Sequence, residues 1–221
     1  MSDPNAKIDP VAMQAVATHV QCTAIRAAAY GKLFGTKPFA VYAFHQLRGK
    51  DEGPFLIDVF CYPMAVQGRD KAVLAVVTNG MSDQAMAPDQ QRPGRPRRRE
   101  LIQYMPECPG WCAQRLRDMA WLPLFDGFLL DARDTVAWDL PAKSDSVWKH
   151  AFFLEPIWTP HQGSFATVGG DEVSFLWHIP ITGAELAFKK EHGANAFLDR
   201  MEKANLPWLF EETNRPALVT E

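Results

Sequence analysis

The run Gly80-Met81-Ser82-Asp83 contains a serine that could act as a nucleophile. A nucleophile elbow requires Gly-x-Ser-x-Gly on a strand-to-helix turn, and Gln84 stands where the last glycine should be. Serine and aspartate also commonly cap the turn after a strand. We therefore expect Ser82 and Asp83 to cap such a turn. A small hydrolase-like site formed by these two residues with His150 remains the alternative.

The cysteines and histidines do not follow a metal-ligand pattern. Cys108 and Cys112 have Cys-x3-Cys spacing, but the nearest histidine is His150, so no second pair follows at a zinc-like distance. The six histidines are scattered. We expect Cys108 and Cys112 to lie one helical turn apart in the core, and we expect no metal and no cofactor. Four cysteines in a chain of this length indicate reduced thiols.

Two carboxylates interrupt or end apolar stretches. Asp58 lies within an otherwise apolar strand, where a buried carboxylate requires a partner or a raised pKa. It is either a binding or catalytic acid, or a residue that faces water at a sheet edge. Glu155, in Leu154-Glu155-Pro156, poses the same question at a strand end, with a solvated loop residue as its alternative.

Five arginines within eight residues make one loop strongly basic. They are Arg92, Arg95, Arg97, Arg98 and Arg99. The chain carries a net charge of −3, so the remainder carries −3 − 5 = −8, which argues against wholesale nucleic-acid binding. No aromatic residue that could stack on bases lies between Gln84 and Leu101. We interpret Arg92–Arg99 as a solvated loop, with binding of an acidic protein or of nucleic acid as alternatives.

The elements that must position these residues are helices and strands without regular alternation. Helices are expected at Val11–Ala29, from Pro109 onward, from the capping box at Thr182 to near Gly193, and at Ala196–Lys203. Strands are expected at Phe39–Leu47, Phe55–Tyr62 ended by Pro63, Ala72–Thr78, Glu100–Met105, Trp148–Leu154 and Val173–Ile179. This order favours an α+β fold. We see no linker, so residues 1–221 are expected to form a single domain.

The start of the chain is polar and lacks the apolar core of a signal peptide. No apolar run approaches the ~18 residues that a membrane-spanning helix needs. We therefore expect a cytoplasmic protein that has no membrane partner.

Several runs resemble the Suppressor of fused family and occur in the order found there. They are Val76–Met86, Arg99–Pro106, Val136–Trp138, His150–Pro156, Phe175–Leu186 and Gly193–Leu209. The resemblance covers nearly everything from about Phe39 to Arg215. It implies a mixed, largely antiparallel sheet flanked by helices, similar to the N-terminal lobe of the animal proteins. It resembles most the single-domain bacterial type, and the chain is expected to lack the second lobe of the animal clamp.

The resemblance implies a non-enzymatic domain that binds a protein partner. Animal members clamp an extended peptide, and single-domain bacterial members are proposed to act as immunity proteins that block toxin domains. Asp134 aligns with an acidic contact position of the family, whereas Leu122 stands at its aromatic contact position. Strand addition to a free sheet edge is physically possible, because an edge offers unpaired backbone groups to any extended segment. The candidate contact residues are Asp134, Asp83, Glu155, Arg95, Arg97 and Arg98.

Overall fold

The computed structural model describes residues 10–43, 56–65, 73–138, 146–157, 165–166, 170–211 and 215–219. Within these ranges, strands pair in the order β1-β2-β3-β4-β8-β6-β5, and β7 pairs with β8 off this path. Only the β4–β8 pair is parallel. The strands are β1 (Ala40–Tyr42), β2 (Asp58–Met64), β3 (Val73–Asn79), β4 (Arg99–Met105), β5 (Thr135–Val136), β6 (His150–Leu154), β7 (Phe165–Ala166) and β8 (Glu172–Ile181). The expected α+β fold with a mixed, largely antiparallel sheet is confirmed.

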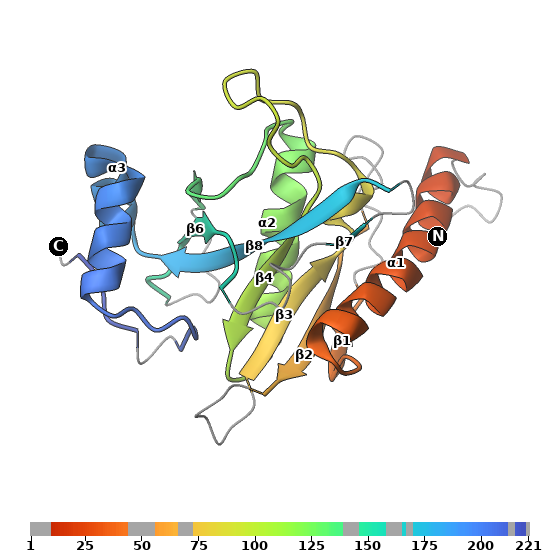
Figure 1. Cartoon of the computed structure of the whole chain (residues 1–221), viewed down its shortest axis with the longest axis horizontal. Coiled ribbons are helices and arrows are strands. Elements are labelled where there is room, and N and C mark those ends of the chain that lie inside the picture. Colours follow the sequence, from red (N-terminus) through yellow and green to blue (C-terminus); the bar gives the residue numbers. More distant parts are fainter. Residues whose placement is uncertain are drawn as a thin grey trace, which may run out of the picture.

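The helices cover both faces of this sheet. They are α1 (Pro10–Phe34), the 3-10 helix η1 (Met81–Asp83), α2 (Gly110–Phe125) and α3 (Gly183–Lys203). Figure 1 shows α2 across β2, β3 and β4, whereas α1 and α3 lie at opposite margins of the molecule. Successive side chains of β2 point to opposite faces of the sheet. Val59 and Cys61 pack in the hydrophobic core that α2 covers, whereas Phe60 and Tyr62 pack in the core on the α1 side. Both faces of β2 are therefore covered.

The bounds of the first two strands differ from expectation. β1 ends at Tyr42, and residues 44–47 of the expected strand lie outside the described residues. β2 continues through Pro63, which was expected to end it, and Pro63 pairs with Leu74 of β3. The pairing of β1 with β2 reaches only as far as Cys61, so the missing N–H of Pro63 points beyond the end of β1. A proline in a strand is tolerated where no neighbour requires its amide.

The start of α3 follows the capping box that the sequence predicts. The Thr182 hydroxyl accepts a hydrogen bond from the Glu185 amide at 3.2 Å, and the Glu185 carboxylate accepts one from the Thr182 amide at 2.8 Å. Gly193 adopts φ 82° and ψ 169°, so it separates two helical segments as expected. α1 extends to Phe34, beyond the expected end at Ala29.

The cysteines correct the expectation of four reduced thiols. Cys61 of β2 and Cys108 form a disulfide across 47 residues. Cys108 precedes α2, so it does not lie one helical turn from Cys112, which is buried in the core of that helix. The strand and the start of α2 are thus joined covalently. Among the described residues, no helix is long and apolar enough to cross a membrane, and no three His, Cys, Asp or Glu side chains are grouped to hold a metal ion.

Candidate functional site

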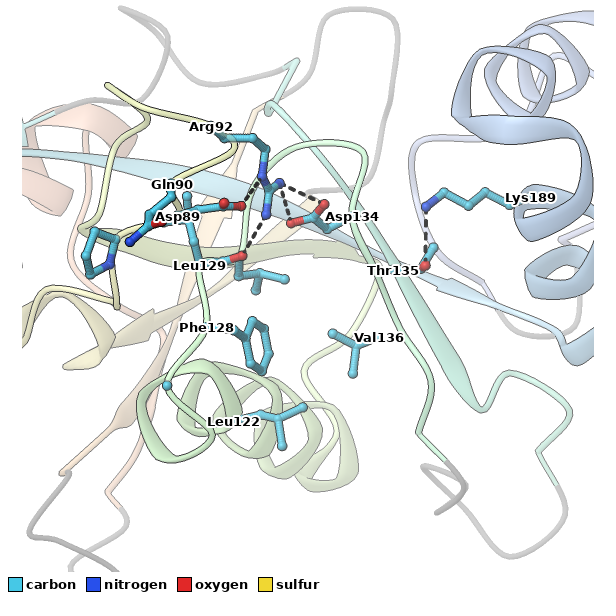
Figure 2. A pocket seen from close by; sticks show the side chains of 13 residues that line it. Asp89, Gln90, Arg92, Leu122, Phe128, Leu129, Asp134, Thr135, Val136 and Lys189 are labelled. Carbon is cyan, nitrogen blue, oxygen red and sulfur yellow. Dashed lines mark hydrogen bonds and ion pairs between the residues drawn. The ribbon is translucent and has the colours of Figure 1, made fainter.

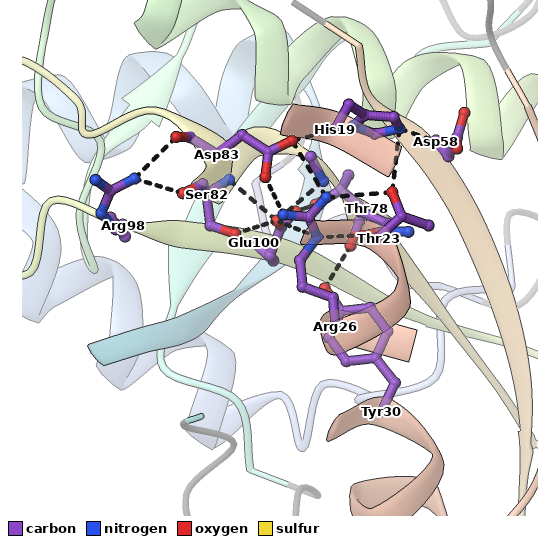
Figure 3. Close-up of polar contacts among 12 residues, drawn as sticks. His19, Thr23, Arg26, Tyr30, Asp58, Thr78, Ser82, Asp83, Arg98 and Glu100 are labelled. Carbon is purple, nitrogen blue, oxygen red and sulfur yellow. Dashed lines mark hydrogen bonds and ion pairs between the residues drawn. The ribbon is translucent and has the colours of Figure 1, made fainter. Parts of the chain in front are cut away.

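The face that α1 turns to the sheet is polar. Its buried side chains are His19, Arg26 and Tyr30, which follow one another at steps of seven and four residues. They meet the ends of β2, β3 and β4 together with η1 (Figure 3). The apolar residues Val16 and Val20 of the same helix are exposed. Hydrogen bonds and charges therefore hold the N-terminal half of α1 in place.

His19 bridges two carboxylates. Its Nδ1 lies 3.0 Å from Asp83 Oδ2, and its Nε2 lies 3.3 Å from Asp58 Oδ2. Burial lowers the pKa of His19, but the hydrogen bonds and charges of Asp58 and Asp83 outweigh this and raise the pKa to about 9. Asp58 is itself buried, so the alternative that it faces water at a sheet edge is wrong. It anchors α1.

Glu100 lies at the centre of the network and is fully buried. One carboxylate oxygen accepts hydrogen bonds from the Gly80 and Ser82 amides at 3.0 Å each and from the Ser82 hydroxyl at 2.6 Å. The other accepts one from the Thr78 hydroxyl at 2.7 Å. Arg26 binds Asp83 and Asn79 and lies 3.9 Å from Glu100. The carboxylate thereby fixes the turn between β3 and η1.

Gly80 is required in this turn. Its φ is 140°, and a Cβ atom there would clash with the carbonyl oxygen of Leu56. The turn therefore passes against the segment that leads into β2. This close approach is what places the amides of Gly80 and Ser82 on the carboxylate of Glu100.

The hydrolase-like alternative requires Ser82 and His150 to meet, and the sheet register separates them. Glu100, which holds Ser82, lies beside Phe175 of β8, whereas His150 lies opposite Ile181. Six residues of β8 span about 20 Å. The Ser82 hydroxyl donates to Glu100, and His150 accepts a hydrogen bond from the Trp138 amide. Ser82 and Asp83 lie within η1, where no side-chain cap hydrogen bond forms, so the expected cap is wrong. Their side chains bind Glu100, His19 and Arg26, and they do not share a site with His150.

The arginines of the loop are held by acidic groups of the chain itself. Arg92 binds Asp89 at 2.6 Å and both oxygens of Asp134 at 2.9 Å, and these hydrogen bonds hold the pKa of Arg92 above its usual value. Arg95 and Arg99 bind Asp131 at 3.2 and 2.6 Å. The loop is therefore anchored at several points and its positive charge is largely balanced.

The remaining arginines of the loop are bound as well. The Arg97 side chain donates to the Met86 carbonyl at 2.7 Å. Arg98 pairs with Asp171 at 2.9 Å and donates to the Ser82 carbonyl at 2.8 Å. The interpretation of Arg92–Arg99 as a solvated loop is wrong for Arg99, which is buried, whereas Arg95 and Arg97 are exposed. Arg92 and Arg98 are partly buried. This loop fastens η1 and the segment before β5.

A cavity of about 650 Å³ opens beside the edge strand β5 (Figure 2). Its apolar lining comes from the end of α2, from the segment before β5 and from β5 itself. These residues are Leu122, Phe128, Leu129, Leu130 and Val136. Its charged lining comes from the arginine loop, from Asp134 and from Lys189 of α3. The cavity combines an apolar interior with charges of both signs.

The outer edge of β5 is open among the described strands, since β5 ends the sheet order. The Asp134 carbonyl accepts a hydrogen bond from the Phe153 amide at 3.1 Å, and Thr135 lies opposite Phe152. Hydrogen-bonded and non-hydrogen-bonded pairs alternate along an antiparallel ladder. The N–H and C=O of Thr135 therefore point away from β6, next to the cavity.

A second cavity, of about 420 Å³, lies at the other end of the arginine loop. Arg95, Arg99 and Glu155 line it, and Arg99 binds Glu155 at 3.1 Å. The predicted contact residues are therefore dispersed. Asp134 lies at the first cavity, Arg95 and Glu155 lie at the second, and Asp83 lies in the network beneath α1.

Sequence reasoning missed the residues that form the network, namely His19, Arg26 and Glu100. One signal could have found the first two. His19, Thr23, Arg26 and Tyr30 recur at helical spacing, so the polar stripe was as regular as the apolar one. Nothing in the sequence near Glu100 shows that a turn 18 to 20 residues earlier would close around it.

These observations describe an α+β protein with a cavity beside an open strand edge. A family model described as Suppressor of fused protein (SUFU) matches residues 54–216, about three quarters of the chain. The chain belongs to the Suppressor of fused family. A search among curated proteins finds no match.

Three solved structures share this fold. A Suppressor of fused homologue from Neisseria gonorrhoeae is 19% identical, with a TM-score of 0.60, and the match covers 94% of this chain and 97% of that one. The Sufu protein of a Sufu–Fu complex is 14% identical at a TM-score of 0.63, covering 89% and 92%. Drosophila Suppressor of fused is 15% identical at 0.63, and the match covers 99% of this chain but 54% of that protein. Members of the family thus bind protein partners.

Proposed function

We propose that this chain is a non-catalytic domain that binds an extended segment of a partner protein along the outer edge of β5. The observation that carries the proposal is the cavity of about 650 Å³ next to the outward-facing N–H and C=O of Thr135. Backbone groups at an open strand edge supply affinity for any extended chain, and a neighbouring pocket supplies selectivity through side chains. Because the cavity lies next to the open edge of β5, one partner segment can use both the backbone groups and the pocket.

The lining of the cavity indicates what the partner segment carries. Leu122, Phe128 and Val136 offer an apolar interior that an aliphatic or aromatic side chain of the partner would fill. Asp134 and Lys189 stand at the same cavity and can each bind a polar or charged group of the segment. Asp134 already holds Arg92, so a basic group of the partner competes with Arg92 for this carboxylate.

Binding of this kind supports a role in sequestration. An extended segment held along β5 is withdrawn from other contacts, and we propose that the partner is neutralised in this way, as an immunity protein neutralises a toxin. The nucleic-acid alternative finds little support, because acidic side chains already bind Arg92, Arg95, Arg98 and Arg99. The enzyme alternative finds little support, because the register separates Ser82 from His150.

The strand-addition model is tested by Thr135→Pro, with Thr135→Ala as its matched control. Proline removes the outward amide and leaves the pairing of Val136 with Ala151 in place. Alanine keeps the amide and removes the γ-methyl group and the hydroxyl, which lies 3.4 Å from the Lys189 ammonium. Proteins retained from a host extract by the immobilised wild-type chain are quantified against both variants. At least one protein should be lost tenfold with Thr135→Pro and kept with Thr135→Ala. Equal retention of every captured protein by both variants contradicts the model.

The contribution of Asp134 is tested by Asp134→Asn, which keeps the size of the side chain. This change removes the charge that faces the cavity, so the dissociation constant for the captured partner should rise several-fold in isothermal titration calorimetry. Val147→Asn, at an exposed position outside both cavities, serves as the control. An unchanged affinity for Asp134→Asn removes this residue from the binding site.

A further inference from the structure

The outward flank of α1 is an apolar surface. Val16, Val20 and Met13 are 39%, 64% and 57% exposed, and Ala17, Ala24 and Ala28 lie exposed beside them. The exposed side chains of α1 carry no charge before Lys32. A helix on a protein surface normally buries its apolar stripe and exposes its polar one. Here the polar stripe is the buried one, so the apolar stripe is available to a partner.

Edge strand β1 extends this surface. Phe39 and Val41 are 76% and 51% exposed. Val41 lies opposite Phe60, whose ring contacts Tyr30 of α1, so Val41 is on the same face of the sheet as α1. Phe39 directly precedes this strand. Met13, Val16, Val20, Phe39 and Val41 form what we call the α1–β1 patch.

The direction of α1 decides where its apolar flank points. α1 runs in the same direction as β2, since His19 contacts Asp58 at the start of that strand and Phe34 stacks on Tyr62 further along it. α1 is right-handed, and its residues His19 and Arg26 face the sheet. The row of exposed side chains that contains Val20 therefore lies on the side of α1 that is nearer to β1. Figure 1 shows α1 and β1 at the same margin of the molecule.

The backbone of β1 is open on this margin among the described strands. The Cys61 carbonyl accepts a hydrogen bond from the Phe39 amide at 2.7 Å, so the backbone groups of Cys61 face β1 and those of Phe60 face β3. Val41 lies opposite Phe60, so its own N–H and C=O point outward. The edge therefore offers a donor and an acceptor at one residue.

We propose that the α1–β1 patch is the interface of a two-fold dimer of this chain. Val41 of one copy pairs with Val41 of the second in antiparallel register, so each N–H meets the other C=O. This pairing joins the two sheets and places the β2 strands of both copies about 14 Å apart, at roughly 4.8 Å per strand. The two apolar flanks of α1 then face each other across the seam, and Phe39 and Val41 of both copies fill the space between them.

Charge and area favour a second copy as the occupant. In a two-fold interface each residue lies near the same residue, or its neighbours, in the second copy. A charged patch would therefore repel its symmetry mate. The α1–β1 patch is uncharged, so it avoids this repulsion. Its large side chains expose on the order of 500 Å², as much as the largest apolar patch of a typical monomer. With the alanines of α1 and the β1 backbone the area approaches the ~800 Å² per partner of a standard interface. This patch is at the opposite end of the sheet order from β5, so dimerisation leaves the proposed peptide site open.

Sedimentation equilibrium of the full chain from 1 to 200 µM tests the proposal. The wild type should dimerise with a micromolar dissociation constant, and Val20→Glu and Val41→Glu should each weaken the dimer at least tenfold. Ile25→Glu, on another exposed side of α1, is the matched control and should leave the constant within twofold. Circular dichroism and thermal unfolding show whether each variant keeps its fold.

Cross-linking gives a second, independent readout. In a Cys22→Ser background, Val41→Cys should form disulfide-linked dimers under mild oxidation, whereas Val147→Cys at an exposed site elsewhere should not. A wild type that stays monomeric at 200 µM overturns the proposal. A dimer that survives both glutamate substitutions, or that cross-links equally at position 147, also overturns it, because its interface then lies elsewhere.

Discussion

The charged bridge at His19 makes the stability of this protein depend on pH in a specific window. The pKa of His19 in the folded state, about 9, lies above the ordinary histidine pKa of 6.5 that holds in the unfolded chain. The bridge therefore contributes fully below pH 6.5, where both states carry the proton, and its contribution is lost as pH rises through 9. We expect the free energy of unfolding to fall across this interval.

The magnitude follows from the size of the shift. A change in pKa from 6.5 to about 9 corresponds to between about 3 and 4 kcal/mol, at about 1.4 kcal/mol per pKa unit. Because Asp83 keeps partial access to solvent, screening reduces the expected loss to about 2 kcal/mol. His178 affects the free energy of unfolding only below this pH range. Burial lowers its pKa well below 6.5, so this residue reduces stability as pH falls below 6.5 and contributes no slope above that pH.

Urea unfolding followed by tryptophan fluorescence at half-unit steps from pH 6 to 9.5 measures this dependence. His19→Gln keeps a polar side chain but cannot carry the charge, so it should be less stable by about 2 kcal/mol at pH 6.5 and should lose most of the slope above it. His192→Gln, at an exposed position of α3, is the matched control and should follow the wild type. If wild type and His19→Gln show the same slope between pH 6.5 and 9, the electrostatic account of how α1 is held is refuted.

Three further predictions concern the elements that frame the site. Gly80→Ala should cost at least about 3 kcal/mol, because it adds a backbone clash to an unfavourable φ, whereas Gly94→Ala, with open space around its Cβ, should cost about 1 kcal/mol in the same urea assay. Thr182→Ala should remove about 1 kcal/mol by breaking the capping box of α3, and a wild-type unfolding midpoint would contradict that role. Reduction of the Cys61–Cys108 disulfide should lower the free energy of unfolding by up to about 4 kcal/mol for a loop of this length, and identical curves with and without dithiothreitol would show that the bond does not form.

The fold was largely predictable because its signals are local. Strands with apolar residues on both faces, such as β2 and β3, indicate a sheet that is covered on both sides. The capping box and Gly193 mark the start of α3 and its break. The start of α1 was expected at Val11 and lies at Pro10, where proline in the first turn is a local signal. These features depend on neighbouring residues, so reading the sequence alone recovers them.

The polar network was not predictable, because it depends on contacts between distant segments. His19 meets Asp83 across 64 residues, and Ser82 meets Glu100 across 18. The sequence showed that Asp58 was either a buried acid or a solvated one, and only the position of α1 decides between them. The disulfide between Cys61 and Cys108 depends on the same kind of long-range placement.

The arginine loop shows a second limit of sequence reasoning. A cluster of like charges predicts a solvated segment when its counter-charges are unknown. Asp131 and Asp134 lie more than 30 residues along the chain from their arginines, and they turn the cluster into an anchored loop. The proximity of Asp134 to an open strand edge, by contrast, agrees with the family resemblance that first drew attention to it.

Amide hydrogen exchange at Thr135 tests the proposed function most directly. Once a partner is captured, exchange is measured for the free chain and for the complex, resolved to the Asp134–Trp138 segment. If the partner adds a strand to β5, the outward amide of Thr135 should become protected at least tenfold. Unchanged exchange at Thr135, with protection on another surface of the chain, would contradict binding along this edge.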